Sequence, residues 1–151
     1  MDVGQSLNPA IDIGQIEGAF MQGYGLVMLE DYRVSPEGIH QSRGPGNYKI
    51  PSFANIPEVM NVSLLRNSKN PRAVYSSKGI GEPPLCLATS VLMSTKYAIS
   101  AARLEAGLTG HFQLDAPATP ERIRMACMDK FAQQFVEDDR KDKEKPWSVK
   151  L

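Results

Sequence analysis

The stretch "NPAIDIGQIEGAFMQGYGLVM", residues 8–28, most strongly sets the fold. From Ile13 to Val27 its apolar residues recur at the spacing of one helix face. Asn8 suits the N-cap, and Pro9 suits the first helical position because the N–H that proline lacks is not needed there. The stretch therefore predicts a long helix near the start of the chain.

This predicted helix is rich in glycine, and each glycine costs a helix about 1 kcal/mol relative to alanine. Gly14, Gly18 and Gly25 fall within one narrow arc of the helical wheel, flanked by Gln15 and Gln22. Such an arc of glycines would allow another surface to pack directly against the helix backbone. Glutamines on helices usually face solvent, but beside such an arc a carboxamide can donate and accept hydrogen bonds to a polar heterocycle.

Short extended pieces are expected between the helices. Residues 32–44 predict a hairpin whose turn is Pro36-Glu37-Gly38. Residues 44–59 are broken by prolines and predict a loop. Residues 60–66 and 72–77 predict two strands from their β-favouring composition and alternation.

Two further helices are expected in the second half. One follows Pro83 and Pro84 and ends near residues 107–111; the other covers residues 119–131, with Thr119 as N-cap. The pattern predicts an α+β fold of helices and short strands over residues 1–136. A charged C-terminal tail is expected over residues 137–151.

The composition argues against several classes of protein. Seventeen basic and seventeen acidic side chains balance, whereas nucleic-acid-binding and membrane-surface proteins favour a basic excess. The apolar runs look too short to span a bilayer, and the start of the chain lacks a signal-peptide pattern. Cys86 and Cys127 lie in apolar, helix-like stretches, so we expect reduced thiols in a cytoplasmic protein.

The sharpest candidate for chemistry is Glu82 in "SSKGIGEPPL", residues 76–85. Pro83 and Pro84 stiffen the backbone after it, and Gly81 allows another surface to come close. A plainer interpretation is that Glu82 caps the second helix, where the helix dipole favours a negative charge by about 0.3–1 kcal/mol. A general base working near neutral pH would instead need a dry pocket that raises its pKa.

Other chemistries find no support in the sequence. The dinucleotide fingerprint, the phosphate-binding loop and the serine-hydrolase elbow are incomplete or absent. His40, His111, Cys86 and Cys127 are scattered without ligand-like spacing, so no protein-ligated metal site is predicted.

Several stretches nevertheless occur in the order of a known family. They are "MDVGQSLNPAIDIGQIEGAFMQG", "SPEG", "SRGP", "YKIP", "SSKGIGEPPL", "ATPERIRMACMDKF" and "KPWSVKL". Together they resemble the C-terminal part of the molybdenum-binding region of xanthine dehydrogenase and aldehyde oxidase. Chains of that family are many times longer and carry iron–sulfur clusters and a flavin domain before the molybdopterin part. We therefore expect this chain to be a fragment.

The resemblance implies roles for three residues. Glu82 matches the family's catalytic base, Gln15 matches the glutamine that contacts molybdopterin, and Gly81 lets the cofactor approach. The implied reaction is hydroxylation of a small purine or aldehyde with water as the oxygen source. The implied cofactor is molybdenum–molybdopterin, with FAD and [2Fe-2S] clusters only in the full-length parent, which is expected to be a homodimer.

The branch of the family stays open. "GEPPL" and "KPWS" favour the xanthine dehydrogenase side, whereas "SSKGIGE" and "RMAC" are closer to aldehyde oxidase. We favour the purine branch and expect the chain alone to be inactive. The alternative is a catalytically inactive remnant with at most a structural or interaction role.

Overall fold

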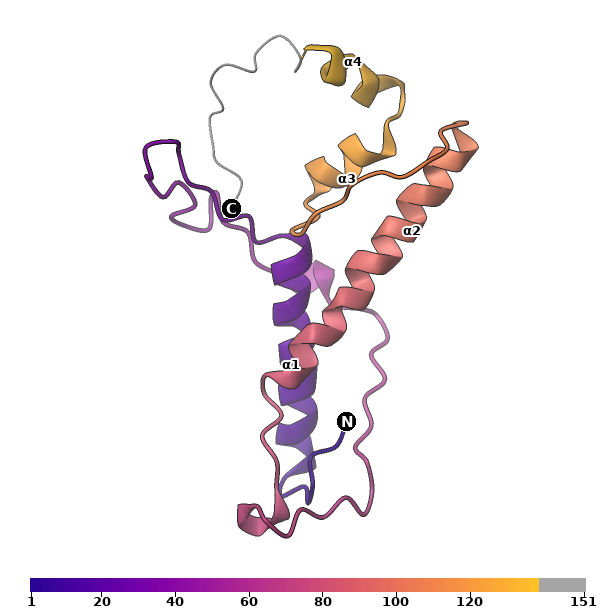
Figure 1. Cartoon of the computed structure of the whole chain (residues 1–151). Helices are drawn as coiled ribbons and strands as arrows, with labels where there is room; N and C mark the ends of the chain where they lie inside the picture. The colour runs from indigo at the N-terminus through magenta and orange to yellow at the C-terminus, as the bar shows by residue number, and fades with distance from the viewer. Residues whose placement is uncertain (139–151) are drawn as a thin grey trace. The chain divides into compact units, whose positions relative to one another are not determined.

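The structure is a computed structural model that describes residues 1–138 (Figure 1). Two isolated antiparallel bridges, Gly4–Ser77 and Val34–His40, are the only β-type pairings in this part of the chain, so the expected α+β class is not confirmed. The helical elements, in chain order, are α1 (Pro9–Met28), η1 (Phe53–Asn55), η2 (Val74–Ser76), η3 (Pro83–Ala88), α2 (Thr89–Glu105), α3 (Pro120–Cys127) and α4 (Lys130–Asp138), where η denotes a 3-10 helix.

The chain divides into two units. The first consists of Met1–Tyr24 and Pro51–Thr89, and the second of Gly25–Ile50 and Ser90–Leu151, which is described as far as residue 138. The expected charged tail over residues 137–151 lies outside the described residues, except that residues 137 and 138 end α4.

The first helix forms as its sequence predicts. Asn8 occupies the N-cap, and its side-chain oxygen accepts a hydrogen bond of 3.1 Å from the Ala10 N–H. The backbone oxygen of Asn8 accepts the first intrahelical bond, from the Asp12 N–H at 3.0 Å. Ile16 on α1 packs with Val3 and Ile80 in the core of the first unit.

The two predicted strands do not form among the described residues. Residues 60–66 have no regular secondary structure and end in a turn at Arg66, and they make only scattered bonds to the start of the chain, such as Leu65 N–H to the Met1 oxygen at 2.8 Å. Within residues 72–77, Tyr75 and Ser76 have φ angles of 51° and 55°, which turn the backbone into η2. An alternating pattern predicts which side chains share a face, but a strand also requires a continuous hydrogen-bonding neighbour.

The predicted hairpin is present in minimal form in the second unit. Val34 and His40 form one antiparallel bridge, and the Ser35 N–H donates to the Ile39 oxygen at 2.9 Å. Gly38 has a φ of 82°, a conformation that side chains strongly disfavour. The glycine in the expected turn is therefore required by the backbone geometry.

The expected second helix is continuous but changes type. Residues Pro83–Ala88 are 3-10 helical and lead directly into α2. α2 ends at Glu105, and Gly107 just beyond it has a φ of 74°, which is typical of a glycine after a helix end. By length and composition, Pro83–Glu105 is long and apolar enough to cross a membrane, contrary to the sequence expectation, although two prolines and a 3-10 turn begin it.

The expected third helix is two helices. α3 begins after Thr119, as predicted, but ends at Met128, whose φ of 54° is left-handed. Asp129 then caps α4, because its carboxylate accepts hydrogen bonds from the Phe131 N–H at 3.0 Å and the Ala132 N–H at 2.9 Å. The sequence interpretation over residues 119–131 overlooked Asp129 as a second N-cap signal.

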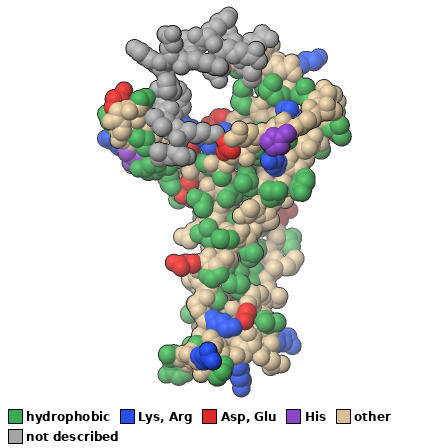
Figure 2. Space-filling model, viewed as in Figure 1, with side chains coloured by type: hydrophobic (Ala, Val, Ile, Leu, Met, Phe, Trp, Pro, Cys, Tyr) green, Lys and Arg blue, Asp and Glu red, His purple; other side chains and the backbone are tan. Residues whose placement is uncertain are grey.

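Large apolar side chains remain exposed in both units. Phe53 is 94% exposed and Val59 73% in the first unit, and Tyr97 is 71% exposed in the second. Figure 2 shows apolar side chains spread over the face that it draws. Soluble monomers rarely expose large contiguous apolar surface, so such side chains usually mark contacts with other protein.

Candidate functional site

Residues 78–82 lead into η3 and contain Gly81 and Glu82, two of the three sequence-predicted site residues. The start of this segment is hydrogen-bonded to the start of the chain. The Lys78 N–H donates to the Val3 oxygen at 2.9 Å, and the Gln5 N–H donates to the Ser76 oxygen at 2.8 Å. Gly4 has a φ of +64°, and a Cβ at this residue would lie 2.1 Å from the Ser76 oxygen. Only glycine permits this close backbone contact.

Asp2 reinforces the same contact. Its carboxylate accepts hydrogen bonds from the Lys78 ammonium at 2.5 Å, from the Ser68 hydroxyl and from the Gly4 N–H at 2.9 Å. These donors, Lys78 first and then Ser68, lower the pKa of Asp2 far below its ordinary value. Asp2 therefore stays ionised near neutral pH and ties residues 68 and 78 to the start of the chain.

The apolar side of this segment is buried. Val3 is 1% exposed, and Ile16 and Ile80 are each 6% exposed, with Val62 and Leu64 packed against them. Ile80 therefore brings the residues that follow it close to α1.

Gln15 and Gly81 meet at this place, although they are far apart in the sequence. A Cβ built on Gly81 would lie 2.8 Å from Oε1 of Gln15. The Gln15 side chain is exposed on α1, and Gly81 is half-buried. The structure thus brings together the two residues that the sequence assigned to cofactor binding.

Glu82 comes directly after Gly81, at the N-cap position of η3. Its φ and ψ are −104° and −41°, and its side chain makes no capping hydrogen bond; only its backbone oxygen accepts from the Leu85 N–H, at 3.0 Å. The carboxylate is exposed. The capping interpretation therefore has the right position but lacks the hydrogen bond that normally supplies most of a cap's stabilisation.

The other end of η3 lies directly on the backbone of α1. A Cβ at Gly23 would be 2.1 Å from the Leu85 oxygen and 2.8 Å from the Ala88 Cβ. Pro84 and Ala88 are fully buried there. An added Cβ at Gly14 or Gly18, which the helical wheel favoured, would have no described atom within 4 Å outside its chain neighbours and the local backbone of α1. The sequence therefore signalled a glycine-dependent contact but not which glycine makes it.

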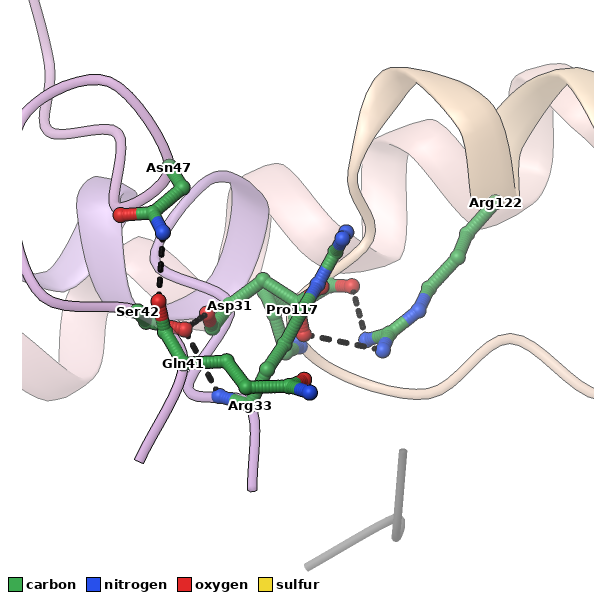
Figure 3. A network of polar contacts seen from close by, with 7 residues as sticks. All are labelled: Asp31, Arg33, Gln41, Ser42, Asn47, Pro117 and Arg122. Carbon is green, nitrogen blue, oxygen red and sulfur yellow. Dashed lines mark hydrogen bonds and ion pairs between the residues drawn. The ribbon is translucent and has the colours of Figure 1, made fainter. Parts of the chain in front are cut away.

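The second unit contains a polar network that the sequence analysis missed (Figure 3). The Asp31 carboxylate accepts from Arg33 at 2.5 Å and from Arg122 at 3.0 Å, and Arg122 also donates to the Pro117 oxygen at 2.7 Å. The Ser42 hydroxyl donates to the Asp31 backbone oxygen at 2.8 Å. No local pattern links Asp31 to a partner 91 residues away.

The same network affects Glu121 at the start of α3. A bond from its own backbone N–H and another from the Thr119 hydroxyl lower the pKa of Glu121, and the charge of Arg33 adds to them. The hydroxyl of Thr119 makes no cap bond to the helix backbone. These groups mainly bond to one another, which is typical of a structural network.

Comparison with known proteins connects this geometry with one family. Residues 1–57 match the family model of a molybdopterin cofactor-binding domain. The chain is 59% identical over 149 residues to the xanthine dehydrogenase of Drosophila pseudoobscura pseudoobscura, and 57% identical over 150 residues to the xanthine dehydrogenase/oxidase of Gallus gallus. Each alignment covers 99% of this chain but only 11% of the relative, so the chain spans about one tenth of the length of these relatives.

A solved structure shares the fold. The quinoline 2-oxidoreductase from Pseudomonas putida 86 is similar with a TM-score of 0.70 and 25% sequence identity. The similarity covers 85% of this chain and 15% of that one.

Proposed function

Because this chain belongs to the xanthine dehydrogenase and aldehyde oxidase family, we propose that it supplies one wall of the molybdenum site of a hydroxylating oxidoreductase. The observation that supports this most is the meeting of Gln15 with Gly81, directly before Glu82. Gln15, which would bind the cofactor, and Glu82, which would accept a proton, therefore lie on adjacent segments. Relatives named xanthine dehydrogenase favour a purine over an aldehyde as the substrate class.

The residues at this place suit a molybdopterin. The Gln15 carboxamide can both donate and accept hydrogen bonds, as the edge of a pterin requires. Gly81 has no side chain to fill the space beside it, and Gly14 leaves the neighbouring surface of α1 open. When bound, the molybdenum cofactor supplies the oxygen-transfer and electron-transfer chemistry.

Glu82 acts in this proposal as the general base. Its carboxylate accepts the proton of the water-derived oxygen that attacks the substrate carbon. The exposed side chain is free to reach a reacting group, while Pro83 and Pro84 limit the movement of the backbone that carries it. In the longer enzyme, other parts of the protein would exclude water from this carboxylate.

The test uses a chimera in which this chain replaces the matching segment of the Gallus gallus xanthine dehydrogenase/oxidase. Glu82→Gln keeps the shape of the side chain and removes the proton acceptor. We expect the kcat per bound molybdenum on xanthine to fall by about 10²–10⁴-fold or more, with an unchanged melting temperature. Glu58→Gln, the same change at another exposed glutamate of the first unit, is the control.

The capping interpretation predicts the opposite result. Loss of charge at the N-cap would lower stability by about 1 kcal/mol or less and leave the kcat per bound molybdenum near the parental value. That outcome would remove Glu82 from the catalytic mechanism.

A further inference from the structure

η3 touches α1 with no side chain between the two backbones at Gly23. An added Cβ there would lie 2.1 Å from a backbone oxygen, that of Leu85, which cannot move as the end of a flexible side chain could. It would also lie 2.8 Å from the Cβ of Ala88, which is fully buried. Any larger residue at position 23 must therefore push η3 away from α1.

Such a movement would reach Glu82 because η3 is a short 3-10 helix that begins with two prolines, which limit the movement of its backbone. Glu82 is its N-cap residue, Pro83 and Pro84 follow, and the Leu85 N–H donates to the Glu82 oxygen at 3.0 Å. Leu85 is thus both the residue that contacts Gly23 and the residue hydrogen-bonded to Glu82. A displacement at one end of this single turn moves the other end with it.

The same segment contacts α1 at a second point, where Gly81 meets Gln15. Gln15 and Gly23 are eight residues apart on α1, or about 12 Å along its axis. Two contacts at this separation fix both the distance between the segment and α1 and the direction in which the segment runs along the helix. Glu82 lies in the segment between them.

We infer that Gly23 is a positioning residue for Glu82. Its missing side chain sets how closely η3 approaches α1, and so where the Glu82 carboxylate lies relative to the Gln15 carboxamide. This inference rests on the proposed function, in which Glu82 is the base. In this inference Gly23 acts through its contact with Leu85 and Ala88 and not by contact with substrate or cofactor.

The experiment uses Gly23→Ala in the chimera. We expect the kcat per bound molybdenum to fall by about 10- to 100-fold, because a misplacement of about 1 Å has a cost of this size. The KM should change little, and the acid limb of the pH–rate profile should shift because the surroundings of the carboxylate change. Gly46→Ala is the matched control, since an added Cβ at Gly46 has no described atom within 4 Å.

A second measurement does not depend on activity. In the molybdenum-free chimera, amide hydrogen exchange of residues 82–90 should become faster in Gly23→Ala and stay unchanged in Gly46→Ala. A purely structural role for Gly23 predicts a lower molybdenum content or melting temperature, with a parental kcat per bound molybdenum and a parental pH profile. That result would overturn the inference.

If Gly23→Ala fails to fold, Ala88→Gly tests the same contact without a clash. Loss of the Ala88 methyl should loosen η3 and lower the kcat per bound molybdenum by a smaller factor, about 3- to 10-fold; a parental rate and pH profile would overturn the inference. Glu82→Gln, run in parallel, separates the two proposals. If Glu82→Gln retains turnover, the proposed base is wrong; if it abolishes turnover while the folded Gly23→Ala retains it, only the role of Gly23 is wrong.

Discussion

Glu82 and Gln15 are exposed side chains whose positions depend on glycines next to them or opposite them. Gly81 lies against the Gln15 carboxamide, and Gly23 lies against the turn that Glu82 begins. At the scale of single residues, the absence of a side chain at Gly81 and Gly23 therefore affects where the two side chains with proposed roles can lie. Glycines in a helix lower its intrinsic stability, but they allow another backbone to come into close contact with it.

For Gln15, we predict that Gln15→Ala in the chimera lowers the molybdenum content of the purified protein. Alanine at an exposed helical position is neutral or slightly stabilising for the fold, so the melting temperature of the molybdenum-free form should not fall. Gln134→Ala, at an exposed position of α4, is the control. Unchanged metal content in Gln15→Ala would return Gln15 to an ordinary solvent-facing role.

At the scale of elements, the break between α3 and α4 shows how one short side chain can separate two helices. Met128 takes a left-handed conformation, and the Asp129 carboxylate then accepts two backbone N–H bonds of the next helix. Asp129 also pairs with Arg124 at 2.6 Å, but both groups are well exposed. Exposed pairs contribute little stability, so the cap is the larger effect.

We therefore predict that Asp129→Ala destabilises α4 by about 1 kcal/mol, whereas Asp129→Asn keeps most of that stability because asparagine caps nearly as well. Amide hydrogen exchange over residues 130–138 of the chimera measures the difference. Equal protection in both variants would mean that the Asp129 cap does not limit the stability of α4.

At the scale of the whole molecule, much apolar surface is exposed in each unit, and few side chains are fully buried. Among the described residues, the buried large apolar side chains include Val3 and Ile16 in the first unit and Ile99 in the second. Residues 60–66, which form no strand, also present backbone groups that lack a continuous neighbour in the described chain. Both features are typical of surfaces that other protein covers.

We accordingly predict that the chain alone, supplied with molybdopterin and an artificial electron acceptor, does not oxidise xanthine or an aromatic aldehyde. It should also bind a hydrophobic dye strongly, because its apolar surface is uncovered. The chimera under the same conditions is the positive control. Turnover by the isolated chain above background would show that it needs no further protein.

The sequence by itself determined the elements whose signals are local. The N-cap and proline of α1, the turn glycine Gly38 and the start of the helix after Glu82 were all predicted, because capping and φ preferences act within a few residues. Residues matching the family's motifs also identified Gln15, Gly81 and Glu82 as candidates, although their roles remain proposals. Asp129 carried a local signal that went unrecognised.

Only the tertiary structure decided which segments meet. It selected Gly23 as the glycine under η3, where the helical wheel had favoured Gly14, Gly18 and Gly25. It joined Asp31 to Arg122, and it left residues 60–66 without the strand that their alternation predicted. Such outcomes depend on the path of the chain between distant residues, and neither local propensity nor side-chain periodicity specifies that path.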